Sequence, residues 1–138
     1  MATAASDNQT LLGFDYGVKH IGIAVGQTLL QSATPLTTLH AIKHKPDWNA
    51  IAQLIVEWQP VELVVGLPFT MDDTESEVAG KAKRFARQLH GRYHLPVHMI
   101  DERLTTREAA SILHTQDKRD GRLDALAAAL ILETWLRK

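Results

Sequence analysis

The sequence predicts an α/β protein built around one five-stranded mixed sheet. Short apolar runs with turn signals between them fill the N-terminal third of the chain, and helical and extended periodicities alternate after that. The chain has 138 residues, of which 45% are hydrophobic, and this suffices for one domain with a substantial core. Each element follows from its own local signals.

Three strands are predicted first. Leu11–Phe14 and Ile21–Val25 are apolar runs joined by "DYGVKH", in which Gly17 supplies the turn of a β-hairpin. A third strand is expected over Ala33–Leu39, because its threonines favour extended structure. Pro35 lacks a backbone N–H, so this strand suits an edge of the sheet.

Helices and strands alternate in the rest of the chain. Asp47 is a good N-cap for a helix with apolar residues at helical spacing, which Pro60 ends. Four further elements are expected: a strand in "VELVVGLP", a helix with an apolar stripe from Val78 to Leu89, a strand in "LPVHMID" and a short helix opened by "TTREAASIL". A final helix runs through Leu123 to Ile131. The order βββαβαβαα matches the ribonuclease-H-like fold, with parallel later strands and helices on both faces of the sheet.

Composition limits the function classes. Residues 1–10 lack the features of a signal peptide, so we expect a disordered tail followed by a single domain over residues 11–138. No apolar run approaches the roughly 18 residues that span a bilayer, and we expect a soluble, cytoplasmic protein. The absence of cysteine excludes disulfides, thiolate zinc sites and cysteine nucleophiles. The net charge of -1 excludes a globally basic nucleic-acid binder but allows a local basic face.

Three carboxylates fall at the positions where sites form in open α/β sheets. Asp15 ends the first strand, Glu102 follows the fifth, and Asp124 lies in the first turn of the last helix. Taken singly, each has an ordinary alternative role as a turn former, a surface ion-pair partner or a favourable charge at a helix N-terminus. Asp101 competes with Glu102, because adjacent strand residues point to opposite faces, and we prefer Glu102.

Convergence of the three acids would indicate a metal site. Bare carboxylates at one edge repel one another, and bound divalent cations reverse that penalty. Hard oxygen ligands suit Mg²⁺ or Mn²⁺. Two such ions about 4 Å apart can activate a water and stabilise the leaving oxygen of a phosphodiester. We therefore predict that Asp15, Glu102 and Asp124 are catalytic metal ligands.

Four boxes in the chain, "FDYGVKHIGIAVG", "VVGLPFTMDDT", "DERLTT" and "GRLDALAAALIL", together resemble the YqgF/RuvX family. These are small bacterial proteins of ribonuclease-H-like fold, related to the RuvC Holliday junction resolvases. The resemblance implies a Mg²⁺-dependent nuclease or junction resolvase, with a role in ribosome biogenesis through maturation of the 5′ end of pre-16S rRNA. Carried over by position, the family's acidic trio falls on the same three residues, Asp15, Glu102 and Asp124.

Basic residues near the acids are candidates for nucleic-acid binding. Lys19 follows Asp15 closely and is a candidate for phosphate contact, and His20 is a candidate for proton transfer. The other predicted contacts are Arg103, Arg107, Lys118, Arg119 and Arg122. The second helix carries a basic face that could track a phosphate backbone, formed by Lys81, Lys83, Arg84, Arg87 and Arg92. For each of these charges, a solvated surface position is the alternative.

Two other functions fit parts of the sequence. A non-catalytic nucleic-acid-binding or regulatory module would keep the fold and the basic surface without productive metal binding. An actin-like ATP-binding protein would explain "DYGVKHIG", but that architecture needs two such domains, and 138 residues supply one. We therefore expect structured RNA or branched DNA as the partner, bound by a monomer or a homodimer.

Overall fold

The computed structural model describes residues 8–68, 77–102 and 122–138 of the chain. The elements in these ranges are β1 (Thr10–Tyr16), β2 (His20–Gln27), β3 (Ser32–His40), α2 (Trp48–Trp58), β4 (Glu62–Leu67), α3 (Glu77–Tyr93), β5 (Val97–Asp101) and α5 (Arg122–Leu136). The five predicted strands and the helices of the described ranges are confirmed in type and order. The short helix expected at "TTREAASIL" lies outside the described residues.

The five strands form one mixed sheet in the order β3-β2-β1-β4-β5. Strands β1, β4 and β5 run parallel to one another, whereas β2 runs antiparallel to both β1 and β3. The register between β2 and β3 shifts after Ile23, where Ala24 pairs with Pro35. Since β3 is one of the two edge strands of this sheet, the edge position predicted for Pro35 is confirmed.

The ordered sheet begins before residue 11. Strand β1 starts at Thr10, and Gln9 exchanges two hydrogen bonds of 2.9 Å with Thr28 in the β2–β3 turn, through its backbone N–H and its carbonyl. Asn8 accepts a hydrogen bond of 3.3 Å from the Leu29 N–H. Residues 8–10 of the expected tail are therefore tied to the sheet by partners that are distant in sequence, and residues 1–7 lie outside the described ranges.

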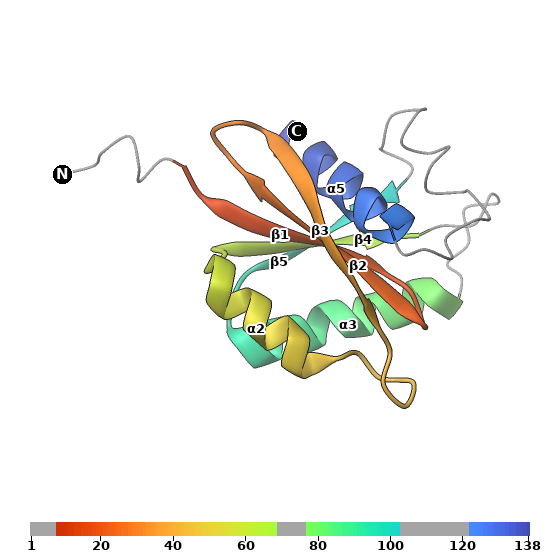
Figure 1. The fold of residues 1–138 in the computed structure, drawn as a ribbon. Coiled ribbons are helices and arrows are strands. Elements are labelled where there is room, and N and C mark those ends of the chain that lie inside the picture. The colour runs from red at the N-terminus through yellow and green to blue at the C-terminus, as the bar shows by residue number, and fades with distance from the viewer. Residues whose placement is uncertain (1–7, 69–76, 103–121) are drawn as a thin grey trace.

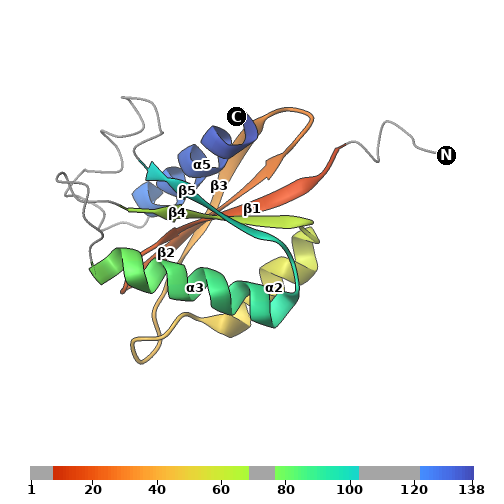
Figure 2. The ribbon, with the colours of Figure 1, turned by 180° about the vertical axis from the view of Figure 1, so that it is seen from behind.

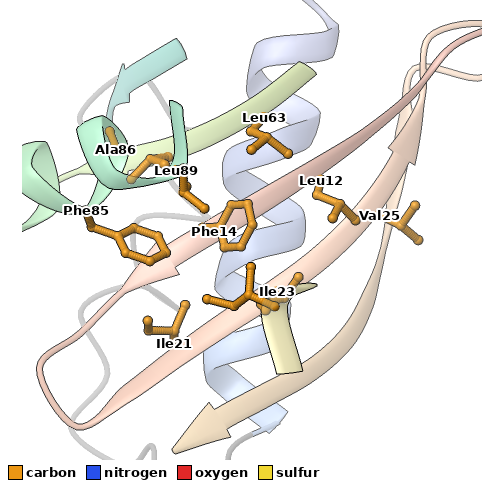
Figure 3. Close-up of a cluster of buried hydrophobic side chains, with 11 residues drawn as sticks. Leu12, Phe14, Ile21, Ile23, Val25, Leu63, Phe85, Ala86 and Leu89 are labelled. Carbon is orange, nitrogen blue, oxygen red and sulfur yellow. The ribbon is translucent and has the colours of Figure 1, made fainter. Parts of the chain in front are cut away.

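Helices cover both faces of the sheet. Helices α2 and α3 lie on one face, and α5 lies on the other (Figures 1 and 2). Figure 3 shows the larger core between the sheet and α2 and α3, in which Phe14 and Ile23 meet Phe85 and Leu89. Phe14 and Phe85 pack edge to face with ring centroids 5.6 Å apart. Among the described residues, none of the helices is long and apolar enough to cross a bilayer.

Helix α2 has the predicted boundaries. The Asp47 carboxylate accepts a hydrogen bond of 3.1 Å from the Ala50 N–H, which is the predicted N-cap. At the other end, Gln59 takes a left-handed conformation and donates its N–H to the Ile55 carbonyl at 2.9 Å. Pro60 follows directly and prevents the helix from continuing.

Small residues allow α5 to approach the sheet closely. Its buried surface is rich in alanine, with Ala125, Ala127, Ala128 and Ala129 all buried. The sheet presents glycines to this helix: a Cβ atom added at Gly13 would lie 2.8 Å from Leu132 Cβ, and one added at Gly22 would meet the α5 backbone itself. The first turn of α5 is therefore held against β2, next to β1.

Candidate active site

Asp15 faces the α5 side of the sheet. It lies two residues after Gly13, whose open side faces Leu132 and Ala128 of α5, and alternate residues of a strand share a face. Its backbone pairs with Gly22 of β2. Asp15 is only 9% exposed. A carboxylate so placed is costly unless charge or hydrogen bonding compensates it, so its position indicates a specific role.

Asp124 reaches the same place from the first turn of α5. Its backbone lies directly over Gly22, the residue that pairs with Asp15. Asp124 is 6% exposed. Within residues 8–68, 77–102 and 122–138, Asp15 and Asp124 are the buried polar or charged residues. Two of the three predicted ligands are thus the two described carboxylates that the fold removes from solvent.

One cavity brings these two acids together. It has a volume of about 350 Å³ and lies between the β1–β2 hairpin and the start of α5. The lining residues are Asp15, Tyr16, Gly17, Val18, Lys19, His20 and Asp124. Gly17 makes the hairpin this tight, because an added Cβ atom would stand 2.7 Å from the His20 carbonyl oxygen. We call this hollow the acidic cavity.

The Glu102 carboxylate lies on the same face of the sheet as Asp15, over the neighbouring strand. A Cβ atom at Gly66 of β4 would stand 3.3 Å from Glu102 Oε1, and the same atom would press on Ile131 of α5. Phe14 of β1 pairs with Val65 of β4, so the next residue of each strand, Asp15 on β1 and Gly66 on β4, occupies a matching position. The Glu102 carboxylate therefore lies over β4, on the side of the sheet that faces α5. Strand β4 is the neighbour of β1, which carries Asp15. By strand alternation, Asp101 belongs to the opposite face.

The three acids lie on the same face of the sheet, near the carboxyl ends of β1 and β5, but they do not form one closed cluster. Asp15 and Asp124 line the acidic cavity, and Glu102 is not among its lining residues. In the described parts of the chain, no group of three or more His, Asp or Glu side chains is close enough together to hold a metal ion. The assignment of all three as metal ligands stays a prediction.

The predicted basic contacts divide into two groups. Lys19 lines the acidic cavity beside Asp15 and Asp124, and its neighbour His20 lines it as well, with its ring 4.7 Å from that of His40. Arg122 begins α5. The other four predicted contacts, Arg103, Arg107, Lys118 and Arg119, lie outside the described residues.

Tyr16 is a lining residue that sequence reasoning missed. Its ring packs against Phe85, with centroids 5.1 Å apart, so it reads locally as a core residue at the end of an apolar strand. Burial raises the pKa of its hydroxyl, and the positive charge of Arg84 partly offsets that rise. The only sequence signal for Tyr16 was its position directly after Asp15, at the start of the hairpin.

Comparison with known proteins decides the family. A family model described as "RuvX: Holliday junction resolvase" matches residues 9–138. The chain belongs to the RuvX family. The predicted family membership is thereby confirmed, and the match covers all the residues described above except Asn8.

Several curated proteins are similar to this RuvX chain over nearly their whole length. A protein of Azotobacter vinelandii is 53% identical over 135 residues, which is 95% of this chain and 95% of that protein. A protein of Pseudomonas putida is 50% identical over 136 residues, 95% of this chain and 96% of that protein. Both carry the name "Putative pre-16S rRNA nuclease".

Solved structures confirm the fold expected for a RuvX protein. RuvC of Thermus thermophilus in complex with a Holliday junction substrate superposes with a TM-score of 0.57 at 16% identity, covering 94% of this chain and 95% of that one. The yeast mitochondrial Holliday junction resolvase gives a TM-score of 0.55 at 13% identity, covering 92% of this chain and 77% of that one. The predicted ribonuclease-H-like fold of the resolvases is therefore confirmed.

Proposed function

We propose that this RuvX-family protein is a divalent-metal-dependent endonuclease that hydrolyses phosphodiesters of structured nucleic acid. Its proposed substrate is the 5′ end of pre-16S rRNA, and Holliday junction resolution is the related activity. The names of the relatives and of the family support the substrate classes. The observation that carries the proposal is the burial of Asp15 and Asp124 in one cavity at the sheet edge.

The donor set of this cavity fits Mg²⁺ or Mn²⁺. Asp15 and Asp124 supply hard carboxylate oxygens, and the cavity of about 350 Å³ leaves space for water and a substrate phosphate beside them. Glu102 approaches along β5 on the same face and would complete the set by turning its side chain away from Gly66. When bound, such an ion would supply Lewis acidity, which activates water and stabilises a leaving oxygen.

The chain's own residues would position the substrate. Lys19 lies at the cavity and would bind a nonbridging phosphate oxygen, because an ammonium group compensates a phosphate charge. His20 lines the same cavity and would donate a proton to the leaving oxygen. Both residues belong to the hairpin that the paired strands β1 and β2 form, so their positions are set before substrate arrives.

Cleavage assays test the proposal. The parent protein and Asp15→Asn are incubated with a labelled pre-16S rRNA fragment and with a four-way DNA junction, with and without Mg²⁺. Asp47→Asn is the matched control, since it makes the same chemical change at a helix N-cap where Asn serves as well as Asp. We expect Mg²⁺-dependent cleavage by the parent and the control, and a loss of at least roughly a hundredfold in Asp15→Asn.

Other outcomes would contradict specific parts of the proposal. Full cleavage by Asp15→Asn would remove the acidic cavity from the mechanism. Tight binding without cleavage by the parent would favour a non-catalytic nucleic-acid-binding module. Cleavage of the junction alone would remove the rRNA assignment.

Action on an rRNA precursor also requires cytoplasmic localisation. We propose a monomer or a homodimer as the acting form, and sedimentation of the active protein would distinguish the two.

A further inference from the structure

A second, larger cavity lies against the β1–β2 hairpin. It has a volume of about 560 Å³ and is formed by the hairpin, the segment before α2, the start of α2 and the length of α3. Its lining residues are Tyr16, Val18, His44, Lys45, Pro46, Trp48, Lys81, Arg84, Gln88 and Arg92. We call it the cationic cavity.

The cationic cavity concentrates positive charge in a protein whose net charge is -1. Among the lining residues that the structure describes, four carry permanent positive charges, namely Lys45, Lys81, Arg84 and Arg92, and none is Asp or Glu. Lys81 has an acidic neighbour one helical turn away: its Nζ lies 3.7 Å from Oε1 of Glu77, whose side chain is 86% exposed. Such an exposed pair is screened by solvent, so the cavity remains an attractive site for anions.

One of these cations is held in place by an aromatic ring. The Arg92 guanidinium lies 4.0 Å from the centroid of the Trp48 ring. Trp48 in turn stacks on Phe85, with centroids 5.6 Å apart and an interplanar angle of 27°. A guanidinium fixed by stacking loses less side-chain entropy when it binds a phosphate than a free one does. The cavity is thus prepared for an anion before any ligand arrives.

The cationic and acidic cavities are neighbours. Tyr16 and Val18 line both of them. A smaller hollow under the hairpin shares Tyr16, Val18, His44 and Pro46 with the cationic cavity. A strand whose phosphate lay at Asp15 and Asp124 would therefore reach the cationic cavity by passing around the tip of the hairpin.

We propose that the cationic cavity binds the phosphates of a single-stranded stretch of the substrate, next to the phosphodiester at the acidic cavity. This inference rests on the proposed function, since it extends the path of the same nucleic acid. A positively charged groove with aromatic side chains is the usual form of a single-strand binding site. A sphere of the cavity's volume is only about 10 Å across, less than the roughly 12 Å width of the B-DNA major groove alone, so a duplex does not enter.

Oligonucleotide binding without cleavage tests this assignment. The anisotropy of a fluorescein-labelled single-stranded RNA is measured in EDTA over a range of salt concentrations. Lys81→Gln/Arg84→Gln removes two cations of the cavity, whereas Lys43→Gln/Lys138→Gln removes two exposed cations outside it. We expect at least a roughly tenfold loss of affinity in the cavity variant, and a slope of log K against log salt reduced by about 1.4, or about 0.7 per lost phosphate contact. The control should lose little of either.

Several results would overturn the inference. An equal loss of affinity in both double variants would show diffuse attraction without a specific site. Equal binding of a duplex RNA, with the same loss in the cavity variant, would exclude the single-strand assignment. Binding of adenosine monophosphate as tightly as the oligonucleotide, with the same dependence on Lys81 and Arg84, would assign the cavity to a free nucleotide. Melting temperatures of both variants are compared with the parent, so that unfolding is recognised.

The outcomes separate this inference from the proposed function. If Asp15→Asn still cleaves while the cavity variant binds RNA weakly, the catalytic assignment fails and the cationic cavity stands. If cleavage requires Asp15 while the two double variants bind alike, the cationic cavity alone fails. Arg92→Lys adds a further test: it keeps the charge but loses the planar stack on Trp48, so affinity should fall with the salt slope unchanged.

Discussion

The backbone carbonyl of Asp124 fills the space that a side chain at Gly22 would need. An added Cβ atom there would also stand 2.8 Å from the Ala125 nitrogen, and backbone atoms cannot yield as a flexible side chain can. Because Gly22 pairs with Asp15 across β1 and β2, this approach sets how closely Asp124 comes to Asp15. The geometry of the acidic cavity therefore depends on a residue that carries no functional group.

Gly22→Ala should lower both stability and cleavage. The added methyl group forces α5 away from β2, and overpacking of this kind costs about 1–3 kcal/mol. Urea unfolding measures the loss, and the cleavage assay measures the displacement of Asp124. Gly80→Ala and Gly91→Ala are the controls: both glycines lie in α3 with open space where a Cβ would stand, so each change should stabilise the protein by about 0.5–1 kcal/mol. A Gly22→Ala variant as stable and active as the parent would contradict the close approach.

Magnesium should raise the melting temperature through the acidic cavity. A ligand that binds only the folded state stabilises it by RT ln(1 + [L]/Kd), which is about 1.4 kcal/mol at a concentration ten times the Kd. For a domain of this size, that corresponds to a rise of roughly a few degrees. Asp15→Asn and Asp124→Asn should each lose most of the rise, and Asp47→Asn should keep it. An undiminished rise in both cavity variants would place the cation elsewhere.

Substitutions of Glu102 and of Asp101 should differ sharply in their effect on cleavage, although the two residues are adjacent. The Glu102 carboxylate lies over Gly66 on the α5 face, whereas strand alternation directs Asp101 to the face of α3. Glu102→Gln should therefore reduce Mg²⁺-dependent cleavage by at least roughly tenfold, and Asp101→Asn should change it far less. Initial rates under saturating RNA provide the measurement. The reverse order of effects would exchange the roles of the two residues.

Stability should fall at high pH in part through the tyrosines. Burial raises the pKa of both Tyr16 and Tyr93 above the ordinary value of 10.0, while Arg84 and Arg92 respectively lower it. The folded state thus holds these protons more tightly than the unfolded state does. Their stabilising contribution is complete below pH 10 and is lost as the pH rises through the folded-state pKa. Tyr16→Phe/Tyr93→Phe removes both tyrosines of the chain, so its urea midpoint should fall less than that of the parent between pH 9 and 11.

Local patterns predicted the elements because their causes are local. The Asp47 cap, the Pro60 stop and the edge position of Pro35 each follow from the backbone chemistry of one residue. The alternation of strand residues likewise predicts that Glu102 and Asp101 point to opposite faces, but it does not say which of the two shares the face of Asp15. The boundary at residue 10 was less accurate, because Asn8 and Gln9 are ordered by the distant β2–β3 turn.

The sequence by itself therefore determined the order of helices and strands, the family and the three acids worth testing, since periodicity, capping and motif spacing are properties of short segments. Only the tertiary structure decided that Asp15 and Asp124 share a cavity while Glu102 lies over Gly66. It also decided that Trp48 holds Arg92 at the edge of a second cavity. These are contacts between segments far apart in the chain, and their distances depend on how closely whole helices pack on the sheet, which no single segment encodes.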